Sequence, residues 1–144
     1  KIASLIKKNI KLKFIGEINM LPIKLKKNIK NSELRTSQNS SLQVNVALNY
    51  GSKTELINSI KKINKKKIKI NESNIDNNLS TKGIIDPDIL IRTGNTQRLS
   101  NFMLWQLAYT EIFFEKKLWP DFKKNDFNKI LNKFKSIKRN FGSI

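Results

Sequence analysis

Cysteine and histidine are both absent from this chain of 144 residues. Without cysteine the chain can form no disulfide and no thiolate metal site, which fits a reducing compartment. Without histidine, no imidazole of this chain can act as a general acid, a general base or a metal ligand. No apolar run approaches the roughly 18 residues that a membrane-spanning helix needs. These absences exclude several common kinds of catalytic and metal site.

Acidic residues are scarce, with 11 Asp and Glu against 29 Lys and Arg, which gives a net charge of +18. Such an excess suggests an anionic partner, which could be nucleic acid, a membrane surface or a phosphorylated small molecule. Lysine, asparagine and isoleucine, however, crowd the whole sequence, as codon usage in an AT-rich genome would produce. We expect most of this charge to lie on solvated surfaces, for example at Lys7, Lys8 and Lys65–Lys67. At 38% hydrophobic residues the chain can still bury a core.

Strand-like and helix-like patterns alternate along the chain. Short apolar or alternating runs predict three strands, at Ile10–Ile15, Leu42–Leu48 and Asp88–Ile91. Apolar residues at helical spacing predict four helices, which begin near Pro22, at Ser52, at Ser100 and before Phe127. Ser52 and Glu55 form a candidate capping box, and the polar stretch from Lys65 to Ser80 reads as a connection with room for a short helix.

This alternation is typical of an α/β domain with a mainly parallel sheet flanked by helices. We interpret residues 1–144 as part of a single domain of this type. Three strands make a thin sheet for a complete domain, and the chain begins at Lys1 rather than Met. We therefore expect an N-terminal part of the domain to be missing.

The segment from Asp88 to Phe102 carries the most chemical information. Its strand would deliver Arg92 to a carboxyl end, where ligands bind in open α/β sheets. A glycine-containing loop then leads past Arg98 to Ser100 at an expected helix start, which favours anions. Two guanidinium groups and a hydroxyl suit a diphosphate, because planar guanidinium forks match phosphate oxygens. The alternative is that both arginines form surface ion pairs and Ser100 only caps a helix.

The same segment resembles the signature of the cis-prenyltransferase family, bacterial undecaprenyl diphosphate synthases above all. The resemblance runs through the following stretches: Arg92-Thr93-Gly94, Arg98-Leu99-Ser100-Asn101-Phe102-Met103-Leu104-Trp105-Gln106, Tyr109, Glu111, Leu118-Trp119-Pro120-Asp121-Phe122, the upstream Asn49-Tyr50-Gly51, and Ile15-Gly16 and Phe141-Gly142 near the two ends. It therefore spans nearly the whole chain. An ordered run of this length is far more specific than a short glycine motif.

The resemblance implies roles for particular residues. Arg92, Arg98 and Ser100 would bind the diphosphate of isopentenyl diphosphate, with the backbone at Leu99 sharing that role. Glu111 would be a ligand of Mg²⁺, which prefers carboxylate and phosphate oxygens. The resemblance also implies a homodimer, to which the aromatic region from Trp105 to Trp119 contributes, and a tunnel that sets product length. The tunnel position is Leu42.

Each of these roles has a simpler alternative. Glu111 could be a surface carboxylate near Lys116, Leu42 could be a plain core residue, and the aromatic residues could be core or interface. In a straight helix Glu111 would lie roughly 16 Å from Ser100 at about 1.5 Å per residue. A metal role for Glu111 thus requires a bent or short helix, or a site in a second subunit.

Three positions depart from the family pattern. Asn95 stands where a second glycine is usual, but asparagine tolerates left-handed backbone. Ser52 replaces a glycine, which its expected capping role explains. Asn140 replaces the arginine of the family's C-terminal Arg-x-Gly element, although Arg139 precedes it, so a phosphate contact from the tail is in doubt.

The family's Asp-Gly-Asn-Gly-Arg motif, which holds the catalytic aspartate and the allylic site, is absent from this chain. The parent enzyme would join isopentenyl diphosphate to an allylic diphosphate, such as farnesyl diphosphate, to make a polyprenyl lipid carrier. We expect residues 1–144 alone to carry the isopentenyl half-site and to be inactive. The expected location is cytoplasmic, with peripheral membrane association left open. The rivals are a non-catalytic subunit of a two-component prenyltransferase and a nucleic-acid-binding module, for which no motif is present.

Overall fold

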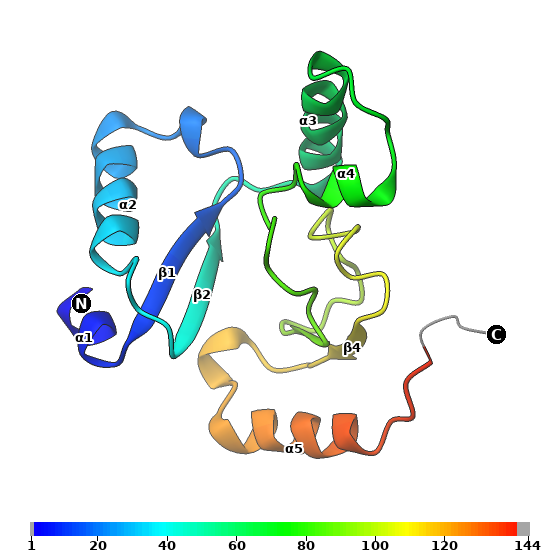
Figure 1. Ribbon diagram of the computed structural model, residues 1–144. Helices are drawn as coiled ribbons and strands as arrows, with labels where there is room; N and C mark the ends of the chain where they lie inside the picture. The colour runs from blue at the N-terminus through cyan, green and yellow to red at the C-terminus, as the bar shows by residue number, and fades with distance from the viewer. Residues whose placement is uncertain (1, 141–144) are drawn as a thin grey trace. The chain divides into compact units, whose positions relative to one another are not determined.

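The computed structural model describes residues 2–140, which fall into two compact units, Lys1–Gly83 and Ile84–Ile144. The elements follow one another in Figure 1 as α1 (Ile2–Lys7), β1 (Ile10–Ile15), η1 (Ile18–Met20), α2 (Ile23–Arg35), β2 (Leu42–Ala47), α3 (Ser52–Lys65) and α4 (Glu72–Asp76) in the first unit, and β3 (Ile89–Arg92), β4 (Glu111–Phe114), η2 (Trp119–Asp121) and α5 (Lys124–Lys135) in the second.

In the first unit β1 and β2 form a parallel pair, in register from Ile10 opposite Leu42 to Ile15 opposite Ala47. Side chains alternate between the two faces of a strand, so Ile10, Leu12 and Phe14 share a face with Leu42, Val44 and Val46. The helix α2 connects the two strands, which makes a βαβ unit. The predicted strands at Ile10–Ile15 and Leu42–Leu48 are thus confirmed, the second with one residue fewer.

Polar side chains from the last turn of α2 and from the residues after it form hydrogen bonds with backbone groups on the free edge of β1. The backbone N–H of Leu12 donates to Thr36 Oγ1 over 3.1 Å, and that of Phe14 donates to Glu33 Oε1 over 2.8 Å. Asn39 Nδ2 donates to the Ile10 carbonyl over 2.7 Å. An open strand edge exposes unpaired backbone groups to other chains. Figure 1 shows α2 beside β1. The three side-chain hydrogen bonds therefore take the place of a further strand at this edge.

Helix α3 begins at the predicted residue but not with the predicted cap. Gly51 is the N-cap, no side chain caps the helix there, and Ser52 is fully buried as its first residue. The capping box of Ser52 and Glu55 is therefore wrong, because the Glu55 carboxylate accepts hydrogen bonds from Tyr50 and Ser80 instead. The core of this unit consists of Ile15, Ile29, Ile63, Ile75 and Leu79.

The second unit holds a parallel pair, β3 and β4, in register from Ile89 opposite Glu111 to Arg92 opposite Phe114. Helix α5 was predicted correctly, and its Ile130 is buried, as are Phe113 of β4 and Leu107. A cation–π contact of 5.9 Å joins Lys133 Nζ of α5 to the Phe113 ring. The predicted strand before Arg92 is confirmed as β3.

The helix predicted from Ser100 to Ile112 is wrong. Residues 100–109 form successive turns, in which Ser100, Asn101 and Met103 have positive φ values of 49°, 61° and 46°. A right-handed helix cannot pass through such residues. The β-branched and aromatic residues that follow favour a strand, and pairing with β3 supplies the backbone partners that a helix would otherwise provide.

Both pairs are parallel and helices accompany each, so the α/β class and mainly parallel strand arrangement are confirmed. Helix α4 is the short helix for which the polar connection left room. Among residues 2–140, no helix is long and apolar enough to cross a membrane. The interpretation of the chain as part of one domain stays a prediction.

Candidate functional site

The loop that follows β3 is anchored at its start by the residues that follow β4. The Arg92 carbonyl accepts from the Glu115 N–H over 2.8 Å. The Gly94 N–H then donates to the Lys117 carbonyl over 2.8 Å, and the Asn95 N–H to the Glu115 carbonyl over 3.1 Å. This pairing extends the β3–β4 ladder beyond Arg92. The loop therefore leaves from a fixed point at the carboxyl end of the strand pair, which is where ligands bind in α/β sheets.

Left-handed backbone recurs along this loop. Gly94 has a φ of 90° and Asn95 a φ of 55°, so asparagine does adopt the conformation for which the usual glycine would be suited. Ser100 and Asn101 are also left-handed. Non-glycine residues in this region carry strain, and such strain clusters at binding sites. Because no helix begins at Ser100, its expected contribution of unpaired helix N–H groups is lost, and only its hydroxyl remains as a candidate ligand.

Four predicted binding residues lie on or beside this loop. The Arg92 side chain is half-buried, and its Nε donates to Thr96 Oγ1 over 3.1 Å, which links the strand end to the loop. Arg98 is exposed and makes no hydrogen bond or ion pair to any of residues 2–140. The Leu99 carbonyl accepts from the Phe102 N–H over 3.0 Å, while Ser100 is exposed. The ion pairs of the alternative interpretation are not formed within the described chain.

Glu111 lies at the opposite end of the strand pair from Arg92. It is the first residue of β4 and pairs with Ile89, whereas Arg92 pairs with Phe114. Three residues of strand separate the two levels, about 10 Å at roughly 3.3 Å per residue. The predicted distance between Ser100 and Glu111 assumed a helix and does not apply, because Glu111 lies in a strand. Within residues 2–140, no group of three or more Asp and Glu side chains that could hold a metal is found.

Leu42 begins β2 and is 54% exposed. Val44, on the same face, is 36% exposed. The plain interpretation of Leu42 as a buried core residue is thus wrong for this structure. Apolar side chains that remain exposed on a sheet face are typical of a surface that another segment or an apolar ligand covers.

The first unit contains a polar cluster centred on Glu55, which the sequence had predicted to be part of a helix cap. Glu55 Oε2 accepts from the Tyr50 hydroxyl over 2.5 Å, and its Oε1 accepts from the Ser80 N–H over 2.9 Å and from the Ser80 hydroxyl. Nearby, Asn58 Nδ2 donates to Glu17 Oε1 over 3.0 Å. The signal that could have found this cluster is the acid at the fourth position after Gly51. Such an acid can reach back to the turn instead of capping the helix.

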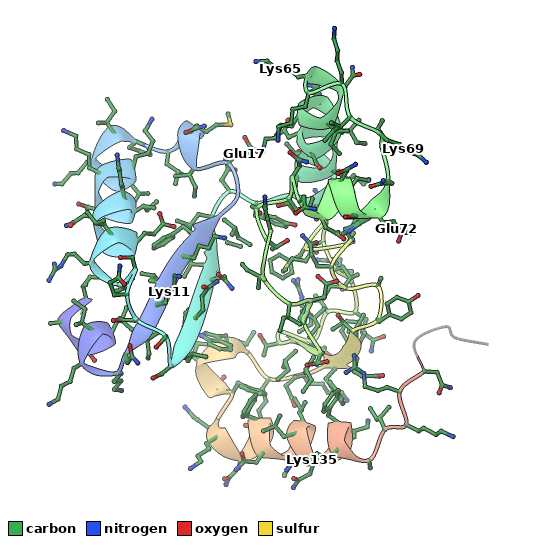
Figure 2. The ribbon with its side chains drawn as sticks, viewed as in Figure 1. Lys11, Glu17, Lys65, Lys69, Glu72 and Lys135 are labelled. Carbon is green, nitrogen blue, oxygen red and sulfur yellow. The ribbon has the colours of Figure 1, made fainter. Side chains whose placement is uncertain are left out.

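A cavity of about 260 Å³ adjoins this cluster at the carboxyl ends of β1 and β2. Its lining includes Glu17, which Figure 2 shows beyond the end of β1, together with Tyr50, Glu55 and Lys62. The carboxylates of this cavity already accept hydrogen bonds from the protein. The cavity is therefore less suited to a diphosphate than the loop after β3, where Arg98 is exposed.

Two ion pairs lie in the second unit, Lys117–Asp126 and Arg139–Asp88. Lys117 Nζ donates to Asp126 Oδ1 over 2.7 Å, and this bond is the main cause that lowers the pKa of Asp126 and raises that of Lys117. The Lys123 N–H, which donates to Asp126 Oδ2 over 2.9 Å, lowers the Asp126 pKa further. Asp126 thus fixes the start of α5.

The basic residues are spread over many elements. Figure 2 shows Lys11 on β1, Lys65 at the end of α3, Lys69 beyond it and Lys135 at the end of α5. Lys65, Lys69 and Lys135 are all exposed. This dispersal agrees with the expectation that most of the charge is solvated surface.

The C-terminal departures have different outcomes. Arg139 Nη1 contacts Asp88 Oδ1 at 2.5 Å and its Nη2 donates to the Tyr109 carbonyl over 3.0 Å, so this guanidinium is already engaged. Asn140 is exposed. Phe141 and Gly142, which carry the resemblance at this end, lie outside the described residues. Arg139 therefore does not take the place of the family's arginine at position 140, because its guanidinium already contacts Asp88 and Tyr109.

Comparison with known proteins gives consistent matches along almost the entire chain. The prenyltransferase family model, described as undecaprenyl diphosphate synthase, matches residues 1–142. An isoprenyl transferase of Oceanobacillus iheyensis is 41% identical over 99% of this chain and 60% of its own length. A ditrans,polycis-undecaprenyl-diphosphate synthase of Wigglesworthia glossinidia brevipalpis, named as specific for (2E,6E)-farnesyl diphosphate, is 43% identical over 99% of this chain and 58% of its own length.

Solved structures give the same picture. A crystal structure described as a probable undecaprenyl diphosphate synthase from Campylobacter jejuni superposes with a TM-score of 0.92 at 37% identity, over 99% of this chain and 67% of that one. Lavandulyl diphosphate synthase from Lavandula x intermedia, in complex with dimethylallyl diphosphate, superposes with a TM-score of 0.91 at 31% identity, over 99% of this chain and 65% of that one. The chain thus spans about 60% of the length of the curated relatives that it matches.

Proposed function

The chain belongs to the undecaprenyl diphosphate synthase family of prenyltransferases, and from that premise we propose that it carries the isopentenyl diphosphate half-site of a cis-prenyltransferase. The parent reaction joins isopentenyl diphosphate to an allylic diphosphate. The allylic diphosphate leaves, the isopentenyl double bond attacks the allylic carbon, and a proton is lost to give a cis double bond. The residues of this chain bind and orient one substrate in that reaction.

The observation that carries this proposal is the exposed, unengaged guanidinium of Arg98 on a left-handed loop that starts at Arg92. Leaving a cation without a protein partner at the carboxyl end of parallel strands favours an anionic ligand. Arg92, Arg98 and the Ser100 hydroxyl would then contact phosphate oxygens, with charge-assisted hydrogen bonds of the stronger kind. The Leu99 backbone would lie beside the same phosphate.

Glu111 is the proposed ligand of Mg²⁺ in this chain. A single protein carboxylate suffices for this role, because Mg²⁺ is usually held by one or two carboxylates together with substrate phosphates and water. The metal would supply neutralisation of diphosphate charge. The remaining donors would come from substrate and from outside residues 2–140. The separation of about 10 Å between the levels of Glu111 and Arg92 favours an arrangement in which Glu111 serves a site in a second copy of the chain.

The exposed face of β2 supports a second part of the proposal. Leu42 and Val44 would line the wall against which the apolar product extends, since each buried CH₂ of the product gains about 0.8 kcal/mol. The product would be a polyprenyl diphosphate used as a lipid carrier. We further propose a homodimer, with peripheral membrane contact during product release.

The proposal is tested by the affinity of the protein that carries this chain for isopentenyl diphosphate. Arg98→Ala should weaken binding by about 10- to 100-fold, because a hydrogen bond to a charged group contributes about 1.5–3 kcal/mol. Isothermal titration calorimetry measures this directly. Arg35→Ala is the matched control, because Arg35 is an exposed arginine at the end of α2.

Equal affinity of the wild-type and Arg98→Ala proteins would refute the proposed site. A second outcome is that Arg98→Ala weakens binding as expected but the wild-type protein shows no turnover with any allylic diphosphate. In that case the alternative of a non-catalytic subunit holds. That outcome would keep the half-site and remove the proposed activity.

A further inference from the structure

Arg139 joins three segments that are far apart in the sequence. Its Nη1 contacts Asp88 Oδ1 at 2.5 Å, its Nη2 donates to the Tyr109 carbonyl over 3.0 Å, and its guanidinium carbon lies 5.4 Å from the centre of the Phe134 ring. The Arg139 side chain is only 20% exposed, although that of Asp88 is 65% exposed. The guanidinium is thus enclosed between α5 and the segments that lead into β3 and β4.

The residues that Arg139 joins stand directly before the strand pair. Asp88 precedes Ile89, the first residue of β3, and Tyr109 lies two residues before Glu111, the first residue of β4. The Asp88 carbonyl accepts from the Glu111 N–H over 3.0 Å. Arg139 therefore closes a ring of interactions that includes the backbone of Glu111. The ring consists of the Arg139–Asp88 ion pair, the hydrogen bond from Glu111 to the Asp88 carbonyl and the hydrogen bond from Arg139 to the Tyr109 carbonyl.

Short strands need such support. A pair of four-residue strands has few ladder hydrogen bonds, and strand ends fray at little cost. A planar guanidinium can direct two donors to two acceptors at once, which a lysine ammonium on a flexible stem does much less well. The aromatic face of Phe134 adds a cation–π contact to the same group.

We propose that Arg139 is a positioning residue: by clasping Asp88 and Tyr109 it fixes the amino end of the β3–β4 pair and thereby the Glu111 carboxylate. This inference rests on the proposed function only for the metal role of Glu111. The clasp itself follows from the contacts of Arg139. It also gives this arginine a role different from phosphate binding.

Two measurements on the protein that carries this chain test the proposal. In Arg139→Gln, amide hydrogen exchange of residues 110–112 should become at least about 10-fold faster, because the ring that holds the Glu111 N–H is opened. Exchange in β1 and β2 should stay unchanged. Binding of Mn²⁺ as a probe for Mg²⁺, followed by electron paramagnetic resonance in the presence of isopentenyl diphosphate, should weaken about 3- to 10-fold.

The controls separate positioning from plain stabilisation. Lys138→Gln removes a neighbouring exposed cation and should change neither measurement. Asp88→Asn should reproduce the effect of Arg139→Gln, and the double variant should add little to either single change, since both break one interaction. Arg139→Lys should recover only part of the effect.

Three outcomes would contradict different parts of the proposal. Unchanged exchange at residues 110–112 in Arg139→Gln would overturn the clasp. Faster exchange with unchanged Mn²⁺ binding would overturn the positioning role if Glu111→Gln does weaken Mn²⁺ binding. If Glu111→Gln leaves Mn²⁺ binding unchanged, the metal assignment of the proposed function fails, and the positioning of Glu111 toward a metal fails with it, whereas the clasp is still decided by exchange.

Discussion

The turn after β2 and the loop after β3 each follow the carboxyl end of a parallel strand, but their polar side chains differ in how they are hydrogen-bonded. After β2, the Tyr50 hydroxyl and the Ser80 N–H both donate to the Glu55 carboxylate. After β3, Arg98 makes no such contact within residues 2–140. A polar group that the protein satisfies itself stabilises the fold, whereas an exposed cation beside left-handed backbone remains available to a ligand.

Gly16, which follows β1, and Gly94, which follows β3, differ in the space around them. A Cβ built on Gly16 would lie 2.2 Å from the Leu48 carbonyl oxygen, whereas a Cβ on Gly94 would meet nothing within 4 Å. Both residues have positive φ. The first unit is therefore closed around its turn, and the second leaves space at its loop. The loop after β3 therefore has room beside Gly94 for the ligand that we propose there.

The largest expected effect comes from substituting these two glycines. Gly16→Ala should destabilise the protein by at least about 3 kcal/mol, because a left-handed φ costs about 1–3 kcal/mol and the clash with backbone adds to it. Gly94→Ala should cost only about 1–2 kcal/mol. Denaturant-induced unfolding measures both changes. Equal losses would mean that the loop after β3 is as closed as the turn after β1.

Glu55→Gln should have the next largest effect, a loss of about 2 kcal/mol in the free energy of unfolding. The amide cannot accept as strongly from Tyr50 and Ser80, and hydrogen bonds to charged groups contribute about 1.5–3 kcal/mol. Thermal unfolding measures the change. Glu72→Gln on the exposed start of α4 is the control and should stay within about 0.5 kcal/mol of wild type. A neutral Glu55→Gln would show that this cluster does not support the turn.

The smallest effect is expected from the Lys117–Asp126 pair in the second unit. The pKa of Asp126 is lowered in the folded protein, so its stabilising contribution is present above its unfolded pKa of about 3.9 and is lost as the pH falls through the folded value. The difference in melting temperature between wild type and Asp126→Asn should be steady from pH 5 to 7 and shrink below about pH 4. Because Lys117 is 48% exposed, that difference should be small.

If the difference instead grew at low pH, the carboxylate would not be the form that the fold stabilises. Repeating the titration in 1 M NaCl should make the difference in melting temperature smaller, because Lys117 is 48% exposed and salt screens exposed ion pairs.

Local patterns in the sequence determined much of this protein. Alternating apolar residues specified β1 and β2, and apolar residues at helical spacing specified α2, α3 and α5, because the period of the apolar residues differs between strands and helices. Asn95 was predicted to accept left-handed backbone and does so. The ordered residues from Arg92 to Phe122 were enough to indicate the family. These features depend on neighbours within a few positions along the chain.

Only the tertiary structure decided the features that depend on distant partners. The stretch from Ser100 to Ile112 has helical spacing, but β3 offers Glu111–Phe114 a parallel partner, and the backbone hydrogen bonds of that pairing override local preference. Glu55 was predicted to cap a helix, but its carboxylate accepts a hydrogen bond from Ser80, 25 residues away. Arg139 is joined to Asp88, 51 residues away. No local pattern encodes such contacts, because they exist only once the segments are folded against one another.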